Sequence, residues 1–292
     1  MRQTRGPVGT TSAATTVSSN HCRLHFSRLR RYVNGWILLL RRRYNDVKGL
    51  QVSAFFAPNF PGQPLQLLSA QHLWPLAALL FLLGVTLMVF SGQRAPAALR
   101  RVRLGIGVAM IAIELSWHAW ALRVGVWHVN YALPLHLCSL AALLAIVMLL
   151  ARSRSLFELL YFWVFAGTTQ ALLTPDLRGF NFPHFHYFWY FSSHGAVILA
   201  VVWMLRVERY RVNWCSFWRA TLITNLYAAV VYPLNLLTGG NYLLLMQKPA
   251  VPTIADWLGA WPGYILWLEL IGVALFVACY LPFAFGDQQR RN

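Results

Sequence analysis

The stretch YALPLHLCSLAALLAIVMLLA, residues 131–151, combines a polar start with a long apolar run. From Leu140 to Ala151 it contains no charged side chain, which is typical of a helix inside a bilayer. His136 and Cys138 lie in the first turns of this predicted helix. A titratable base and a soft nucleophile therefore stand where a membrane helix begins.

Similar apolar runs recur along the chain. Of its 292 residues, 58% are hydrophobic and 11% are charged, whereas soluble domains have about 25% charged residues. We therefore predict an all-α, polytopic membrane protein with one integral membrane domain over residues 52–292. Seven spans are predicted, at 72–91, 103–123, 133–151, 156–174, 187–206, 216–237 and 262–284.

The formal net charge of +17 is concentrated at the N-terminus and in short segments between the apolar runs. That distribution is typical of topology signals and not of a nucleic-acid-binding surface, so we predict no nucleic-acid partner. Residues 1–51 are basic, acid-poor and rich in Ser and Thr, as organellar transit peptides are. We interpret them as a disordered basic extension, which a mis-assigned start site would also produce.

Arginines in alternate connections predict the orientation of the spans. They follow the first, third, fifth and seventh spans: Arg94, Arg100, Arg101, Arg103, Arg152, Arg154, Arg206, Arg209, Arg211, Arg290 and Arg291. The intervening connections carry only Arg123, Arg178 and Lys248. The arginine-rich ends are therefore predicted to face the cytoplasm, and the other ends to face outward.

Polar side chains gather at the predicted outer ends of six spans. Because a polar group in a bilayer is costly unless it meets water or a partner, we expect one shared cavity that opens outward. The alternative is that each group separately caps a helix or meets interfacial water. The predicted cavity residues are Glu114, His118, His136, Cys138, Thr169, Ser193, His194, Asn235 and Glu269.

A Cys–His pair is the first chemistry that these residues allow. The positive end of a helix favours a thiolate at Cys138. His136 lies two residues away and so points to another face of the helix, which leaves His194 on another span as the base. The alternative is that Cys138 packs as a small apolar residue and that His194 is a hydrogen-bonded core histidine.

Two other chemistries are open on the residues alone. Histidines and Glu269 are ligand types for Zn²⁺, but the chain has no HExxH motif, and the pair His184 and His186 is a weak signal. We predict no metal and no cofactor. Intramembrane Glu114 and Glu269 would instead suit a solute or ion transporter or channel without enzymatic activity.

Five separated motifs carry a resemblance to a known family. They are PLHLCS (134–139), LLTPDL (172–177), SSHG (192–195), NYLLLMQKP (241–249) and LGAWPGYIL (258–266). In this order they resemble the YwaF-like family of bacterial integral membrane proteins, which is similar to the eukaryotic transmembrane protein 164. The resemblance covers about residue 55 to the C-terminus.

The resemblance implies a multi-pass protein of the bacterial cytoplasmic membrane whose partners are membrane lipids. The eukaryotic relative is described as an acyltransferase that remodels phospholipids, so the implied activity is acyl transfer or lipid ester hydrolysis. The cysteine and histidine that match the family motifs are Cys138, as acyl-accepting nucleophile, and His194, as base. Thr169, Ser193 or Asn235 would then stabilise the oxyanion, and Glu114 or Glu269 would orient a histidine.

Overall fold

The computed structural model describes residues 54–60, 62–90, 95–249 and 254–288, except for the side chains of 254–255 and 286–288. The predicted basic extension, residues 1–51, lies outside the described residues. Within the described ranges the regular structure is helical and no strand occurs. The predicted all-α class is therefore confirmed.

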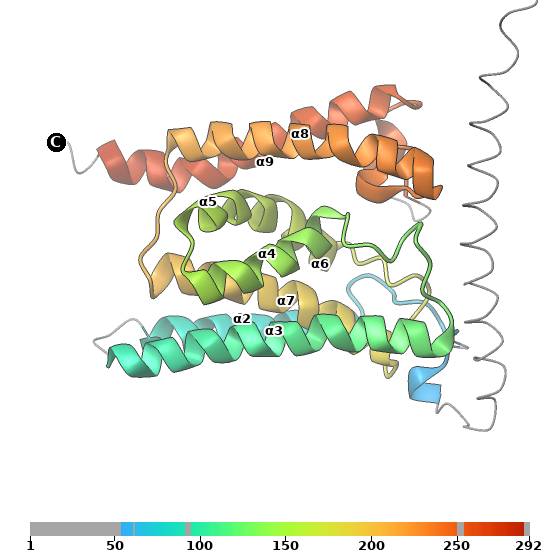
Figure 1. The fold of residues 1–292 in the computed structure, drawn as a ribbon, viewed down its shortest axis with the longest axis horizontal. Coiled ribbons are helices and arrows are strands. Elements are labelled where there is room, and N and C mark those ends of the chain that lie inside the picture. The colour runs from blue at the N-terminus through green and yellow to red at the C-terminus, as the bar shows by residue number, and fades with distance from the viewer. Residues whose placement is uncertain (1–53, 61, 91–94, 250–253, 289–292) are drawn as a thin grey trace, which may run out of the picture. The chain divides into compact units, whose positions relative to one another are not determined.

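The longer helices follow the predicted apolar runs closely (Figure 1). They are α2 (Ala70–Phe90), α3 (Pro96–Val124), α4 (Leu137–Ala151), α5 (Arg154–Trp163), α6 (Thr169–Leu173), α7 (Phe185–Arg206), α8 (Trp214–Thr238) and α9 (Gly263–Gln288). A π-helical turn at Val164–Thr168 joins α5 to α6, so 154–173 is one continuous helical segment. Short 3-10 turns occur at Ala54–Phe56, Tyr242–Leu244 and Ile254–Trp257.

Six helical segments of the described chain are long and apolar enough to cross a membrane: α2, α3, the α5–α6 segment, α7, α8 and α9. The third predicted span differs, because its helix α4 has only 15 residues and begins at Leu137 instead of near 133. Turns precede it from residue 126 to 136, where Pro134 cannot donate a backbone hydrogen bond. The protein is therefore a multi-pass membrane protein with one short apolar helix.

Local sequence explains where several helices begin and end. Pro96 occupies the first turn of α3, where a missing N–H costs nothing, and Gly125 ends that helix in the left-handed conformation. Asn213 and Ser216 form a reciprocal capping box at the start of α8. Consecutive long helices run in alternate directions (Figure 1).

Helix α7 lies at the centre of the packing. It contacts α2, α3, α4, α5 and α6, whereas α8 and α9 pack mainly on each other and on the α5–α6 segment. Figure 1 shows α2 and α3 on one side, the α8–α9 pair on the other, and α4, α5 and α7 between them. The central position of α7 explains why its side chains are mostly buried, including the bulky Trp203 and Tyr187.

The peripheral helices expose apolar side chains. Phe81 and Met88 on α2, Leu237 on α8 and Leu266 on α9 are all at least 70% exposed. Apolar exposure on this scale is normal where the surrounding solvent is lipid. Membrane lipids therefore surround these helices.

The arginine-rich ends of the helices, which we call the inner end, are held by ion pairs, and the arginine of one of these pairs is buried. Arg103 on α3 donates to the carbonyl of Leu149 and lies 3.2 Å from a carboxylate oxygen of Glu208. The other oxygen of Glu208 accepts from Arg152 at 2.5 Å. This cluster joins α3, the end of α4 and the loop after α7, so some of the predicted topology signals also stabilise the fold.

Replacing Arg103 is expected to destabilise the protein strongly. The change Arg103→Met leaves the buried carboxylate of Glu208 with one partner fewer and the carbonyl of Leu149 with no side-chain donor. Removing one member of a buried ion pair costs about 3–5 kcal/mol, so the midpoint of unfolding in detergent should fall markedly. Arg100→Met at an exposed position is the control, and equal midpoints for the two variants would contradict the role of the cluster.

Candidate functional site

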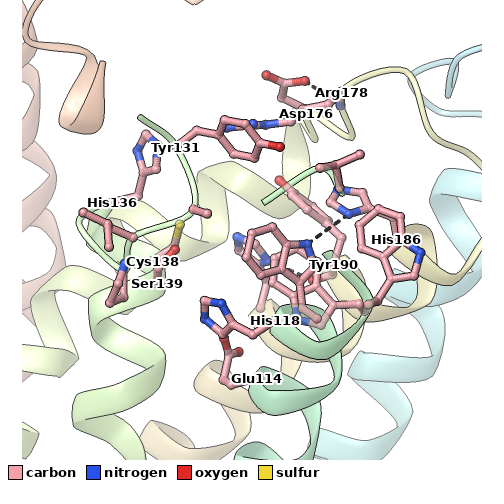
Figure 2. Close-up of a pocket in the computed structure, with 18 of the residues that line it drawn as sticks. Glu114, His118, Tyr131, His136, Cys138, Ser139, Asp176, Arg178, His186 and Tyr190 are labelled. Atoms are coloured by element: carbon pink, nitrogen blue, oxygen red, sulfur yellow. Dashed lines mark hydrogen bonds between the residues drawn. The ribbon is translucent and has the colours of Figure 1, made fainter. Parts of the chain in front are cut away.

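A cavity of about 380 Å³ lies at the opposite end of the helices, which we call the outer end. Glu114 and His118 of α3, His136 before α4, Cys138 of α4 and His194 of α7 all line it. Five of the predicted cavity residues therefore face one space. Figure 2 shows Cys138 and Ser139 on one wall of this outer cavity, with His186 and Tyr190 on the opposite wall.

The wall that carries Cys138 is fixed by two tyrosines. The hydroxyl of Tyr242 donates to the carbonyl of Val129 at 2.8 Å and accepts from the N–H of Leu133 at 3.0 Å. The hydroxyl of Tyr227 donates to the carbonyl of Leu135 at 3.0 Å. Irregular backbone at membrane depth needs such partners, and these bonds set where the chain turns into α4.

The first turn of α4 is open toward the outer cavity. His136 precedes the helix in an extended conformation, and its side chain makes no capping hydrogen bond. The first N–H groups of a helix have no partner within the helix, and Cys138 and Ser139 belong to this first turn. Cys138 therefore lies at the positive end of a helix, as the sequence predicted.

His136 is neutral at ordinary pH. Its ring packs against Tyr242, with 5.1 Å between the ring centroids. Burial and, to a smaller extent, the positive charge of Arg178 lower the pKa of His136 to about 4, against the opposing charge of Asp176. His136 is thus a neutral polar group of the wall and carries no charge into the outer cavity.

His194 is held in one tautomer. Its Nδ1 lies 2.8 Å from the carbonyl oxygen of Tyr190. Because a carbonyl can only accept, Nδ1 carries the proton and Nε2 carries the lone pair. The rings of His194 and Tyr190 also stack, with centroids 4.2 Å apart. A neutral histidine with a fixed lone pair thus lines the same space as Cys138.

Glu114 approaches His194 from α3. The hydroxyl of Ser193 donates to its carboxylate at 2.5 Å, and this carboxylate lies close enough to His194 to interact with a positive charge on the ring. Ser193 is not among the residues that line the cavity, and its hydroxyl binds this carboxylate. The hydrogen bond between Ser193 and Glu114 joins α7 to α3 beside the candidate base.

Two further histidines are oriented by tryptophans. Trp127 Nε1 donates to His118 Nδ1 at 3.2 Å, and Trp117 Nε1 donates to His186 Nδ1 at 3.3 Å. An indole N–H only donates, so both Nδ1 atoms are unprotonated and both rings carry their proton on Nε2. His118 and His186 therefore present N–H donors and no basic nitrogen to the outer cavity.

The pair His184 and His186 does not act as one unit. His184 Nδ1 accepts from the backbone N–H of His186 at 3.0 Å, and its Nε2 lies 2.9 Å from the carbonyl of Ala57. One nitrogen of His184 therefore caps α7, and the other bonds the chain after the turn at Ala54–Phe56. In the part of the chain that the structure describes, no three His, Cys, Asp or Glu side chains are grouped as metal ligands.

Four predicted residues lie outside the outer cavity. Ser193 binds Glu114, and Thr169 donates to the carbonyl of Val164 at 3.2 Å. Asn235 exchanges hydrogen bonds with the backbone of Tyr242 at 2.8 and 2.9 Å, and Glu269 accepts from Asn225 at 2.7 Å. The side chains predicted to stabilise an oxyanion thus make hydrogen bonds within the protein instead.

Sequence reasoning missed three residues at the mouth of the cavity: Tyr131, Asp176 and Arg178. Figure 2 places Asp176 and Arg178 together at the rim, with Tyr131 beside them. The guanidinium carbon of Arg178 lies 4.3 Å from the centroid of the Tyr131 ring. The signal was present in LLTPDL, which Arg178 follows directly, but the partner ring lies 47 positions away in the sequence.

Cys138 and His194 share the cavity without touching. Among the described hydrogen bonds, none joins the thiol of Cys138 to the ring of His194. Catalytic hydrogen bonds are often long in a protein without substrate and tighten when substrate binds. Cys138 and His194 therefore line the same cavity. Nε2 of His194 has no hydrogen-bond partner among the described residues.

Comparison with known proteins identifies relatives over most of the chain. The model of the TMEM164 family matches residues 67–280, which confirms the resemblance seen in the motifs. The chain is also 30% identical to an uncharacterized protein of Treponema pallidum (strain Nichols) over 163 residues, 56% of this chain and 67% of that protein. No solved structure matches the chain significantly.

His136 should make the protein sensitive to acid. Its pKa is about 4 in the folded state against 6.5 for an unperturbed histidine, so the unfolded chain binds a proton first as the pH falls. Its contribution to stability is therefore lost between about pH 6.5 and 4. Thermal unfolding at pH 7.5 and 4.5 should show a smaller loss of Tm for His136→Gln than for the unchanged protein. His128→Gln, at an exposed position of the same loop, should lose as much as the unchanged protein. The expectation fails if all three lose the same amount.

Proposed function

The chain belongs to the TMEM164 family, and from that premise we propose that it transfers an acyl chain of a membrane lipid through a thioester on Cys138. The observation that carries the proposal is the shared outer cavity, which joins a cysteine at a helix N-terminus to a histidine with a fixed lone pair. His194 is the base in this proposal. An activated thiol and a neighbouring base are what nucleophilic acyl transfer requires.

Helix α4 would activate the nucleophile. The partial positive charge at a helix N-terminus favours a thiolate over a thiol. The same N–H groups of Cys138 and Ser139 would accept the charge that develops on the carbonyl oxygen during attack. Backbone donors thus take the role that the sequence assigned to Thr169, Ser193 or Asn235.

In the proposed reaction, His194 accepts the proton of the nucleophile and later passes it to the leaving group. Nε2 of His194 takes the proton of the Cys138 thiol, and Sγ attacks the carbonyl carbon of a lipid ester. The tetrahedral intermediate collapses, the C–O bond of the ester breaks, and the departing alcohol takes the proton from His194. The acyl chain of the lipid is then bound to Cys138 as a thioester. A lysolipid hydroxyl or water then gives its proton to Nε2 of His194 while its oxygen attacks the thioester carbonyl. The C–S bond breaks, the new ester or the free acid leaves, and Sγ of Cys138 takes the proton back from His194.

Glu114 would stabilise the protonated form of His194. Its carboxylate lies close enough for the two charges to interact, and a buried carboxylate that faces an imidazolium lowers the energy of that state. The backbone carbonyl of Tyr190, and not Glu114, orients the ring. Glu114 therefore acts only through its charge in this scheme.

The packing beneath the outer cavity favours a one-sided site over a conduction pathway. Met110 on α3, Ala145 on α4 and Val201 on α7 lie deeper in the membrane domain, and each is at most 2% exposed. A transporter needs a route to both faces. All three belong to one packed hydrophobic core, which favours a site open to one side, so acyl transfer is the function we place first.

Trapping the thioester tests the proposal. The full-length protein in lipid is incubated with a phospholipid that carries a tagged acyl chain, and hydroxylamine-sensitive adducts are mapped by mass spectrometry. The tag should appear on Cys138 and be absent from Cys138→Ala. It should still form in Cys215→Ala, which alters an exposed cysteine at the inner end.

The base is tested by a substitution that keeps its structural hydrogen bond. In His194→Asn the side-chain N–H₂ takes the place of Nδ1–H and donates to Tyr190, but no atom replaces Nε2. The folded variant should form the thioester about 10²–10⁴-fold more slowly. No adduct in the unchanged, folded protein, or an adduct of undiminished rate in His194→Asn, would contradict the proposal.

A further inference from the structure

We propose that Arg178 binds the phosphate of a phospholipid headgroup at the mouth of the outer cavity and so determines which lipids enter it. The inference rests on the proposed function, because it concerns the substrate of the same site. Arg178 is the only lysine or arginine among the residues that line this cavity in the described part of the chain.

The guanidinium of Arg178 is held in place but is not neutralised. It packs over the ring of Tyr131, which lies in the loop before α4. The ion pairs of the described residues involve Glu158 and Glu208 at the inner end, and none includes Arg178. Stacking on an aromatic face leaves the N–H groups at the edge of a guanidinium free for a ligand.

The backbone also directs this side chain. Arg178 has φ of 51° and Gly179 has φ of 82°, both in the left-handed region. A non-glycine residue adopts this conformation only at a cost in free energy. The carboxylate of Asp176 accepts the N–H of Arg178 at 2.9 Å and stabilises the turn. The loop thus maintains an unfavourable backbone conformation that sets the guanidinium over Tyr131.

Phosphate is the ligand that this chemistry fits. A guanidinium presents paired N–H donors that match two phosphate oxygens, and such bonds are about twice as strong as neutral ones. His118 and His186 add neutral N–H donors to the same cavity, as their tryptophan partners require. A lipid ester that reaches Cys138 from the membrane would leave its headgroup at this mouth.

Asp176 acts in the opposite direction. Its carboxylate lines the same cavity and is not paired with the side chain of Arg178 in any described ion pair. A negative charge beside a phosphate weakens phosphate binding. Asp176→Asn removes that charge and keeps an oxygen that can accept the N–H of Arg178. Neighbouring substitutions should therefore shift affinity for a phosphate in opposite directions.

Lipid binding can be measured without acyl transfer. Full-length protein carrying Cys138→Ala, in uncharged detergent, is titrated with lysophosphatidylglycerol, with the monoacylglycerol of the same chain, or with inorganic phosphate. The rise of Tm with ligand concentration gives the affinity of each. Lysophosphatidylglycerol should bind more tightly than monoacylglycerol, and millimolar phosphate alone should leave Tm unchanged.

The variants then isolate the phosphate contact. Arg178→Gln should weaken lysophosphatidylglycerol binding roughly 10- to 100-fold, the loss typical of a charge-assisted hydrogen bond, and leave monoacylglycerol binding unchanged. Arg178→Lys should restore part of the affinity, and Asp176→Asn should raise it. Arg123→Gln, an exposed arginine of the outer end that does not line the cavity, should match the reference protein.

Three results would overturn the inference. If the Arg178→Gln variant bound both lipids with the affinities of the reference protein, Arg178 would make no headgroup contact. Equal losses for both lipids would show that it only supports the fold. Phosphate that raises Tm as much as the lysolipid does would show a site for free phosphate. Failure of thioester trapping would refute the proposed function but leave these binding results standing, since Cys138 is absent from them.

Discussion

The short helix α4 and the irregular chain before it constrain the rest of the outer end. A helix of 15 residues spans about 22 Å, less than the hydrocarbon thickness of about 30 Å. The turns that complete this crossing must find hydrogen bonds inside the protein. Tyr242 and Tyr227 supply them. A helix that begins below the membrane surface leaves space above it, and its free N–H groups face that space.

The other walls of the outer cavity follow from the same arrangement. Helix α7 carries His194 past the start of α4, and the Ser193–Glu114 hydrogen bond ties it to α3. Tryptophans from α3 and the following loop fix His118 and His186. At the inner end, the ion pair of Arg103 and Glu208 joins α3 to the loop after α7. The two ends therefore have separate roles: ion pairs stabilise the inner end, and oriented histidines with a few charged side chains surround a cavity at the outer end.

The sequence predicted the helices well because the length of an apolar run is set by membrane thickness. It misplaced the start of α4 by about four residues, since periodicity does not reveal that turns continue to His136. It predicted that polar groups gather at one end. It did not separate cavity residues from structural ones, because Asn235 differs from Glu114 only through partners on other elements. Arg178 was overlooked because its role depends on a ring that is distant in the sequence.

The central claim is that Cys138 faces water from the outer end only. It can be tested on full-length protein in membrane vesicles of known orientation, with Cys22, Cys215 and Cys279 replaced by Ala so that Cys138 is the single thiol. A membrane-impermeant thiol reagent should label Cys138 from the side opposite the Arg152 loop and leave it unlabelled from the other side. Labelling at equal rates from both sides, or from neither side, would contradict the account.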